Sequence, residues 1–504
     1  MSETEIHQIH RPMWNIKEKE MEDISTDSLQ YIPYYDMNLN DPNTVSDFRI
    51  EINDRTNFFY PHKSYLEFSF NIVTNNAAGT PYAAGAPITI QNNAASINKR
   101  YEFMFDDQIV DYVDNPDISL NVHNLVYFSQ EHNTIASQML WYPDTVDNPN
   151  VDVNQANGQP LFEYGIEAVN TGMRKRWQIT YNSTIITCQI PLKNIFGLFR
   201  AYDKVTKGIK MSVRLTKNDY NNILLRAVGV ADGKINFAKN GIKWWMPRVK
   251  PNPSIMPMLT SKLSDTSNFM VPFVDLQVWR SNKYTAAANN QVYQIRTKRQ
   301  RPLKVFVCFQ LDDPTNANNF VAYSLATTNS GPFSRYVTPN TFGTARVTGD
   351  QTNIKTIFDH INLTKLRVTL NSTTQYPEQE YSTVFPQSQT QTPGDPPVAN
   401  AYPTGLQADY ARVYSEFLRT GLRDHGIEEG TNVSYDTFKS LYPIFAIDLS
   451  EKAEYFVEPE SALIEIMWSN NTIFNYYMWV IIESEKSIEM SCNEGQMKIL
   501  KVIE

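Results

Sequence analysis

Residues 209–215 read IKMSVRL, a stretch in which apolar and polar side chains alternate without a break. A strand with this period of two buries one face and leaves the other wetter, as is typical of antiparallel sheets. The same pattern recurs in both halves of the chain, in DFRIEIN (47–53), YLEFSFNI (65–72), LKVFVCF (303–309) and KLRVTL (365–370). The chain is therefore expected to contain many half-buried strands.

One further stretch, FNYYMWVII (474–482), is apolar apart from Asn475, which predicts a central strand buried on both faces. Helical patterns are few and short, and they cover residues 121–140, 194–202 and 407–422. Strands and helices do not alternate at the spacing of a parallel α/β fold. The predicted fold class is mostly β, with antiparallel sandwiches or barrels as the default.

Composition sets the scale of the fold. A chain of 504 residues with 41 % hydrophobic side chains can bury substantial cores in two to four domains. Aromatic residues reach 12 %, which favours pleated, half-buried strands. The net charge of −9 argues against general nucleic-acid binding.

The sequence also indicates the cellular compartment in which the protein is made. No apolar run approaches the roughly 18–20 residues of a membrane span. The polar start MSETEIHQIHRPMW lacks the apolar core of a signal peptide, so we expect a protein that is made inside the cell and is not secreted through such a signal. The only cysteines, Cys188, Cys308 and Cys492, are expected to be reduced, and they exclude a disulfide scaffold or a cysteine-based zinc site.

Three segments are predicted along the chain. Residues 1–46 are polar and aperiodic and form an N-terminal arm, whose tyrosines favour ordering against a neighbouring subunit. A boundary is predicted in PRVKPNPSIMPM (247–258), because its four prolines block regular structure. Two similar β-domains follow from this division, one over 47–250 and one over 251–504.

A weak similarity of pattern between two parts of the sequence, which we call the internal echo, supports two similar halves. CQIPLKNIFGLF (188–199) precedes an alternating strand around Val213, and LYPIFAIDL (441–449) precedes another around Glu465. Val213 and Glu465 are 252 positions apart, half the length of the chain. The echo is one of pattern only, and such echoes arise readily by chance in β-proteins.

Catalytic motifs are missing from the sequence. It contains no P-loop, no HExxH, no GxSxG and no CxxC. His7 and His10 form an HxxH in the arm, but two ligands do not make a structural metal site. His62 and His360 each lie beside a strand, where a single histidine is most often structural.

Two acidic groups could be read as the carboxylate pair of a glycosidase: Asp106 with Asp107, and Asp424 with Glu428 and Glu429. Surface acids are the commoner explanation. The basic clusters MRKRW (173–177) and RTKRQR (296–301) are interpreted as solvated strand edges. We therefore predict no catalytic residue, no cofactor-binding residue, no metal ligand and no cofactor, which fits a structural assembly unit rather than an enzyme.

Four strings carry a resemblance to a known family: KNIFGLFRAYDKVTKGIKMSVRLTKND (193–219), GIKWWMPRV (241–249), FDHINLTKLRVTLNSTTQYP (358–377) and SLYPIFAIDL (440–449). They resemble segments of the double jelly-roll, hexon-like major capsid proteins of the adenovirus and tectivirus lineage. The nearest resemblance is to the capsid proteins of Polinton/Maverick elements and adinto-like viruses. It runs from about residue 47 to the C-terminus, in the same order.

The resemblance implies two tandem eight-stranded jelly rolls with a few short helices and long loops. It implies a homotrimer with a pseudo-hexagonal outline, many copies of which tile an icosahedral shell around double-stranded DNA. The implied partners are further copies of the chain and penton and minor capsid proteins, with no sequence-specific nucleic-acid binding. The arm is expected on the inner side of the shell, where contact with an internal membrane is open to it, and the loops 143–172, 311–353 and 384–406 form an outer crown. The implied location is the virion, assembled inside the host cell.

Two alternatives stay open from the sequence. One is a scaffold or minor capsid relative on the same fold. The other, from a different class, is a carbohydrate-active β-sandwich enzyme or lectin, which a sugar-binding or hydrolysis assay would support.

Overall fold

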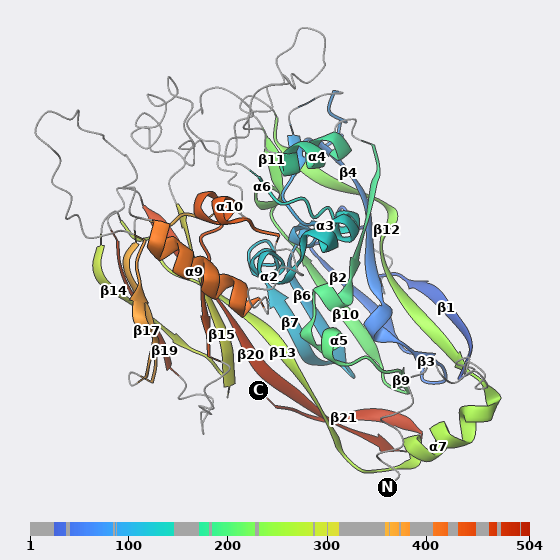
Figure 1. Ribbon diagram of the computed structural model, residues 1–504. Coiled ribbons are helices and arrows are strands. Elements are labelled where there is room, and N and C mark those ends of the chain that lie inside the picture. The colour runs from blue at the N-terminus through green and yellow to red at the C-terminus, as the bar shows by residue number, and fades with distance from the viewer. Residues whose placement is uncertain are drawn as a thin grey trace, which may run out of the picture.

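The computed structural model places most of the chain in antiparallel sheets (Figure 1). It describes residues 25–36, 41–83, 86, 88–145, 171–180, 184–226, 231–285, 288–299, 301–311, 358–361, 363–371, 374–383, 407–421, 432–449, 463–470, 475–493 and 495–503.

Eight main strands between residues 26 and 251 form two facing sheets. They are β1 (Thr26–Tyr34), β2 (Asp47–Ile52), β4 (Tyr65–Thr74), β6 (Asn98–Phe105), β7 (Gln108–Asp114), β8 (Ile186–Pro191), β10 (Met211–Lys217) and β12 (Gly233–Pro251). One sheet runs β8-β4-β12-β1 and the other β2-β10-β6-β7. Four short strands complete this half: β3 (Phe58–Phe59), β5 (Ile88–Ile90), β9 (Thr206–Lys207) and β11 (Leu224–Arg226).

Eight further strands after residue 268 repeat the arrangement. They are β13 (Phe269–Arg280), β14 (Ala288–Arg296), β15 (Arg301–Leu311), β16 (Leu363–Leu370), β17 (Thr374–Tyr381), β18 (Phe445–Asp448), β19 (Leu463–Asn470) and β20 (Tyr476–Asn493). Their sheets run β13-β20-β15-β18 and β14-β19-β16-β17. A last strand, β21 (Gln496–Ile503), pairs with β20.

The two halves share one topology. When the eight main strands of each half are numbered in chain order, both halves have one sheet in the order 1-8-3-6 and one in the order 2-7-4-5. This is the strand order of a jelly roll, so the fold is mostly β with two tandem eight-stranded jelly rolls, as predicted. The internal echo is also confirmed, because its two copies lie at strands six and seven of each roll.

Helices are short and connect the strands. The α-helices are α2 (Ser119–Tyr127), α3 (Gln130–Ala136), α4 (Thr171–Thr180), α5 (Gly197–Ala201), α6 (Tyr220–Ile223), α7 (Met256–Ser264), α9 (Gln407–Thr420) and α10 (Tyr435–Ser440). The 3₁₀ turns are η2 (Pro61–Lys63), η3 (Ala94–Ile97), η4 (Ser137–Met139), η5 (Leu192–Asn194) and η6 (Pro253–Ile255). The predicted helices over 121–140, 194–202 and 407–422 correspond to α2–α3–η4, to the short α5 and to α9.

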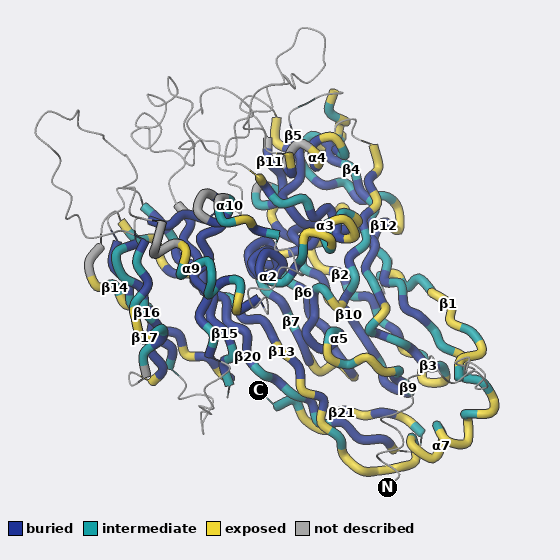
Figure 2. The backbone as a smooth tube through the Cα atoms, in the orientation of Figure 1, coloured by how far each residue is buried: buried dark blue, intermediate teal, exposed yellow. Residues whose placement is uncertain are grey.

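Each roll has a core between its two sheets (Figure 2). In the first roll, Phe103 from β6 meets Trp244 from β12, with ring centroids 6.5 Å apart. In the second, Phe309 from β15 meets Trp468 from β19 at 6.2 Å. The stretch 47–53 buries one face as predicted. The prediction is wrong for 303–309, where Lys304, Phe306 and Cys308 on the second face are buried as well. The apolar run around residue 480 is the central strand β20, which pairs with both β13 and β15.

Two expectations about regular structure are wrong. The 1–46 segment was expected to lack regular structure and to lie outside the first roll, but β1 pairs with β12 over Thr26–Tyr34 and supplies the first strand of that roll. The sequence pattern does not reveal this strand, because it lies at a sheet edge, where neither of its faces is fully buried. The proline-rich joint also contains a helix, α7, since Pro257 sits in the first turn, where its missing N–H costs no hydrogen bond. Residues 1–24 and nearly all of the loops 143–172, 311–353 and 384–406 lie outside the described residues.

All three cysteines are free and buried, in agreement with the expected reduced state. Burial raises the pKa of the Cys188 thiol to about 12 and raises that of Cys308 well above its ordinary value. A thiol that stays protonated reacts slowly with disulfide reagents. We expect Ellman's reagent to label no thiol in the native chain at about pH 8, and all three in concentrated guanidinium chloride. A disulfide found by mass spectrometry of the non-reduced protein would contradict this reading.

Candidate functional site: the contact between the two jelly rolls

The two rolls lie side by side, and the contact between them is the best defined polar site in the described residues (Figure 1). At its centre the backbone of α5 from the first roll meets the edge strand β13 of the second. A side-chain carbon placed on Gly197 would lie 1.8 Å from the carbonyl oxygen of Val274. A second close approach occurs where such a carbon on Gly421 would lie 2.6 Å from the carbonyl oxygen of Val126. Glycine at these two positions therefore lets the backbones of the two rolls touch.

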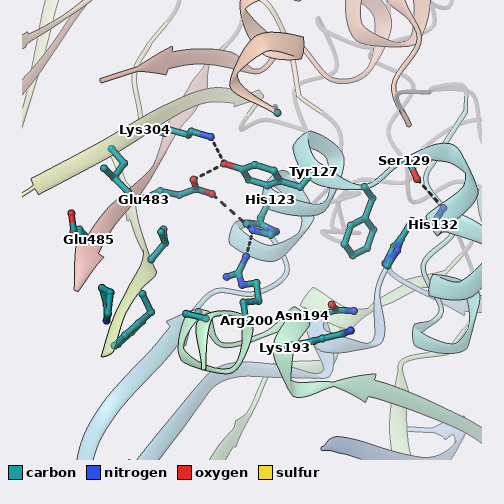
Figure 3. A pocket seen from close by; sticks show the side chains of 18 of the residues that line it. His123, Tyr127, Ser129, His132, Lys193, Asn194, Arg200, Lys304, Glu483 and Glu485 are labelled. Atoms are coloured by element: carbon teal, nitrogen blue, oxygen red, sulfur yellow. Dashed lines mark hydrogen bonds and ion pairs between the residues drawn. The ribbon is translucent and has the colours of Figure 1, made fainter. Parts of the chain in front are cut away.

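A buried hydrogen-bond network crosses the contact beside α5 (Figure 3). Lys304 of β15 donates to the hydroxyl of Tyr127 on α2, with Nζ 2.9 Å from the oxygen, and to the carbonyl of Thr420 at 2.7 Å. The Tyr127 hydroxyl in turn donates to Oε2 of Glu483 on β20 at 2.6 Å. Lys304 and Glu483 are 9 % and 5 % exposed, so this network is largely shielded from water. Hydrogen bonds of this kind fix the lateral position of one roll on the other.

His123 and Arg200 extend the network into the first roll. The Arg200 guanidinium hydrogen-bonds to Nε2 of His123, which lies 4.0 Å from Oε1 of Glu483. Burial, reinforced by Arg200, holds the pKa of His123 well below its ordinary value, so the ring is neutral and Nε2 accepts from the arginine. Burial raises the pKa of Glu483, against the opposing effects of Tyr127, Lys304 and Arg200.

A cavity of about 1430 Å³ opens next to this network. Its walls come from both rolls: Phe128, His132 and Lys193 belong to the first, and Arg301 and Glu485 to the second. Within the wall that the second roll contributes, Arg301 and Glu485 form an ion pair, with Nη1 of the arginine 2.9 Å from Oε2 of the glutamate. The cavity therefore follows the seam between the rolls.

A second buried charge cluster lies directly beside the close approach of Gly197 to Val274. Arg299 donates through Nε and Nη2 to one oxygen of Asp275, at 3.0 and 2.6 Å, and both side chains are almost fully buried. Asp111 of β7 accepts the backbone N–H of Leu198 at 3.0 Å. Burial, with a contribution from the nearby Asp275, raises the pKa of Asp111 to about 6, although Lys486 and Arg200 oppose the rise. Acidic groups from the two rolls thus share one desolvated environment.

A third set of contacts joins the region around α4 in the first roll to the residues just after α10 in the second roll. Arg176 of α4 forms an ion pair with Asp144 at 2.8 Å, and neither side chain is exposed. The hydroxyl of Tyr442 from the second roll donates to the carbonyl of Asp144 at 2.7 Å. The Arg176–Asp144 pair therefore orders the strip of backbone that the second roll contacts.

The basic clusters were interpreted as solvated strand edges, and this is wrong at two positions. Arg176 lies in a helix and Arg299 in a tight connection between β14 and β15, and both are fully buried. Each is paired with an aspartate distant in sequence, which no local pattern reveals. Because a lone buried charge is costly, these pairings are what allow the arginines to be inside.

The other candidate residues do not converge. Nδ1 of His62 lies 2.6 Å from the carbonyl oxygen of Phe199, and His360 is buried beside β15. Asp106 and Asp107 form the turn between β6 and β7, where Asp107 pairs with the surface cations Arg49 and Lys210. The remaining candidates lie outside the described residues: His7, His10, Asp424, Glu428 and Glu429. Within the part of the chain that is described, no cluster of three His, Cys, Asp or Glu side chains could hold a metal ion, and no helix is long and apolar enough to cross a membrane.

Comparison with solved structures identifies a similar fold, whereas comparison of the sequence finds no match. No protein-family model and no curated protein matches the chain. Among solved structures, a chain of the Sputnik virophage, determined by cryo-EM at 3.5 Å, matches with a TM-score of 0.55 and 11 % identity, over 97 % of this chain and 92 % of that one. The Faustovirus major capsid protein and the mavirus major capsid protein score 0.47 each, at 10 % and 11 % identity, over 97 % of this chain and 94 % and 93 % of theirs. The Sputnik match shows a shared fold, whereas scores below 0.5 establish no more than a general likeness.

The close approach at Gly197 predicts a large effect of a single methyl group. In Gly197→Ala the new carbon must displace the backbone of β13, and we expect a loss of about 1–3 kcal/mol in the free energy of unfolding, measured by urea denaturation. Gly495→Ala is the matched control, because nothing lies within 4 Å of the added carbon there. At Gly495 only its positive φ of 76° opposes a side chain, at a cost of about 1–2 kcal/mol or less. Equal stability of Gly197→Ala and the unmodified chain would contradict the tight contact.

Asp111 predicts a specific pH dependence. Its pKa of about 6 in the folded chain exceeds the ordinary 3.8, so the folded state binds the proton more tightly than the unfolded state. The charged carboxylate therefore destabilises the fold above about pH 6, and this cost disappears as the pH falls toward 4. Asp111→Asn removes the charge and keeps an acceptor for Leu198, so we expect it to be about 1–3 kcal/mol more stable than the unmodified chain at pH 8, with the difference vanishing near pH 4. Urea denaturation at both pH values measures this, and a pH-independent difference would refute the assignment.

Proposed function

We propose that the chain is a major capsid protein, a structural subunit that acts without catalysis. The observation that carries the proposal is a pair of jelly rolls of identical topology, locked together by buried contacts, in a fold shared with a chain of a virophage over 97 % of the length. Two similar rolls in one rigid chain suit a tile that repeats in a shell.

In this proposal the working unit is a homotrimer. Three chains would contribute six jelly rolls around one axis, giving a pseudo-hexagonal capsomer that tiles an icosahedral shell around a double-stranded DNA genome. A closed cyclic arrangement limits assembly at that interface to a finite number of chains. The division of the chain near residue 250 into two jelly rolls is part of the proposal, and it is supported by sheets that contain no strand pairing across that point in the described residues.

The proposed partners are those of a virion component. They are further trimers and penton and minor capsid proteins, with no sequence-specific contact to the genome. The N-terminal segment before β1 is proposed to lie on the inner side, where contact with an internal membrane is open to it. The protein would be made and assembled inside the host cell, without export through a signal peptide.

The mass of the purified protein tests the proposal. Gel filtration coupled to light scattering should give a particle of three times 58.0 kDa at micromolar concentration, and electron microscopy should show triangular or hexagonal tiles. The reason is that an obligate interface of well over ~2,000 Å² should leave little free monomer. A stable folded monomer or a dimer would count against the trimer. Sugar binding or hydrolysis by a chain that does not assemble would replace the capsid proposal.

A further inference from the structure

The first strand of each roll lies at the edge of its sheet, and within the described residues only the edge strand of the second roll contacts the other roll. In the second roll, α5 and β7 of the first roll contact β13, and Phe273 and Asp275 on it are buried, although Met270 and Val274 are 50 % and 37 % exposed. No residue of β1 is buried. In the first roll, β1 takes the same place in the sheet, next to strand eight. Leu29 and Tyr31 on β1 are 40 % and 41 % exposed. An edge strand that presents apolar side chains in this way is a ready site for association.

The exposed edge continues into an aromatic surface. The ring of Tyr31 lies 5.7 Å from that of Tyr65 on β4, which in turn stacks on Trp245 of β12 at 6.1 Å. We call Leu29, Tyr31, Tyr65 and Trp245 the β1 patch. Beneath it Glu67 accepts hydrogen bonds from Lys243 at 2.7 Å and from the indole of Trp245 at 3.0 Å. Glu67 therefore keeps its hydrogen-bond partners when the patch is covered.

We infer that the β1 patch binds the second jelly roll of another copy of this chain, through the face formed by β17 and α9. This inference rests on the proposed function and names the surface by which the copies meet. The argument is the internal repeat. Within the chain β13 contacts α5 and, beside it, β7 and α2, which are the fifth strand and the helix after it. β17 and α9 are their counterparts in the second roll.

The counterpart face is available for such a contact. Among the described strands β17 pairs with β16 alone, and Glu378 and Gln379 on it are exposed, as is Arg419 on α9. If the contact between rolls is repeated from one chain to the next, it covers the β1 patch of one copy and the β17–α9 face of the other at once. The contact joins unlike surfaces, so it propagates from copy to copy until a ring closes.

Site-specific cross-linking tests which surface covers the patch. A photoreactive benzoylphenylalanine is placed at position 29 or 31, and light and isotopically heavy chains are mixed before assembly so that cross-links between copies can be recognised. We expect inter-chain cross-links to peptides within 374–381 and 407–421. Cross-links to residues 1–24 of the same chain, or to the first roll of another copy, would overturn the inference.

Charge substitution gives an independent measure. The double variant Leu29→Asp with Tyr31→Asp should raise the protein concentration needed for half-assembly by roughly tenfold or more, with an unchanged far-UV circular dichroism spectrum. Val292→Asp is the matched control, because this 48 % exposed residue lies on β14, whose counterpart β2 packs on β1 and β10 rather than on the second roll. Normal assembly of the double variant would overturn the contact.

The outcomes separate this inference from the proposed function. Particles whose cross-links map to other surfaces would overturn the contact alone. A complete lack of self-association by the unmodified chain would overturn both.

Discussion

At Gly197 the backbone of α5 lies against the carbonyl edge of β13, closer than any side chain would allow. A sheet edge satisfied or covered in this way no longer offers its backbone to foreign strands. The close approach also brings α2 near enough to β15 and β20 for Lys304, Tyr127 and Glu483 to share hydrogen bonds. The contact at Gly197 therefore sets how closely the two rolls approach, and the hydrogen bonds beside it fix their position along the seam.

The buried ion pairs near this seam contribute more to defining the geometry than to the stability of the fold. Burying Asp275 with Arg299 and Asp144 with Arg176 removes four charges from water, and the attraction between partners does not always repay that desolvation. Such pairs tolerate little displacement, however, since a partner that moves leaves a charge unpaired in a dry environment. Each pair lies within one roll, so it fixes the surface that the other roll contacts. The hydrogen bonds from Tyr127 to Glu483 and from Lys304 to Tyr127 cross between the rolls and set their register, whereas the apolar cores account for most of the stability.

The sequence-based predictions succeeded where burial follows a local period and failed where it does not. β2 alternates cleanly because one face of it meets a core. β1 was missed, since a sheet edge imposes no such period. The internal echo also aligned the two strands one residue out of phase. Val213 faces the core of the first roll. Glu465, between the buried Ile464 and Ile466, points to the opposite face of its strand, toward Gln294. The buried arginines and the seam were beyond prediction, because their partners are brought close only by the complete fold.

The pairing of strand one with strand eight has a consequence for synthesis on the ribosome. In the first roll β1 cannot pair until β12 has been made, because Thr26 pairs with Pro251. In the second roll β13 cannot pair fully until Met490 of β20, the partner of Phe269, has been made. Closing such long loops is slow, and domains generally fold in order of their emergence. The first sandwich can therefore complete itself during translation and present α5 as a preformed template, on which the nascent β13 can rest until its partner leaves the tunnel.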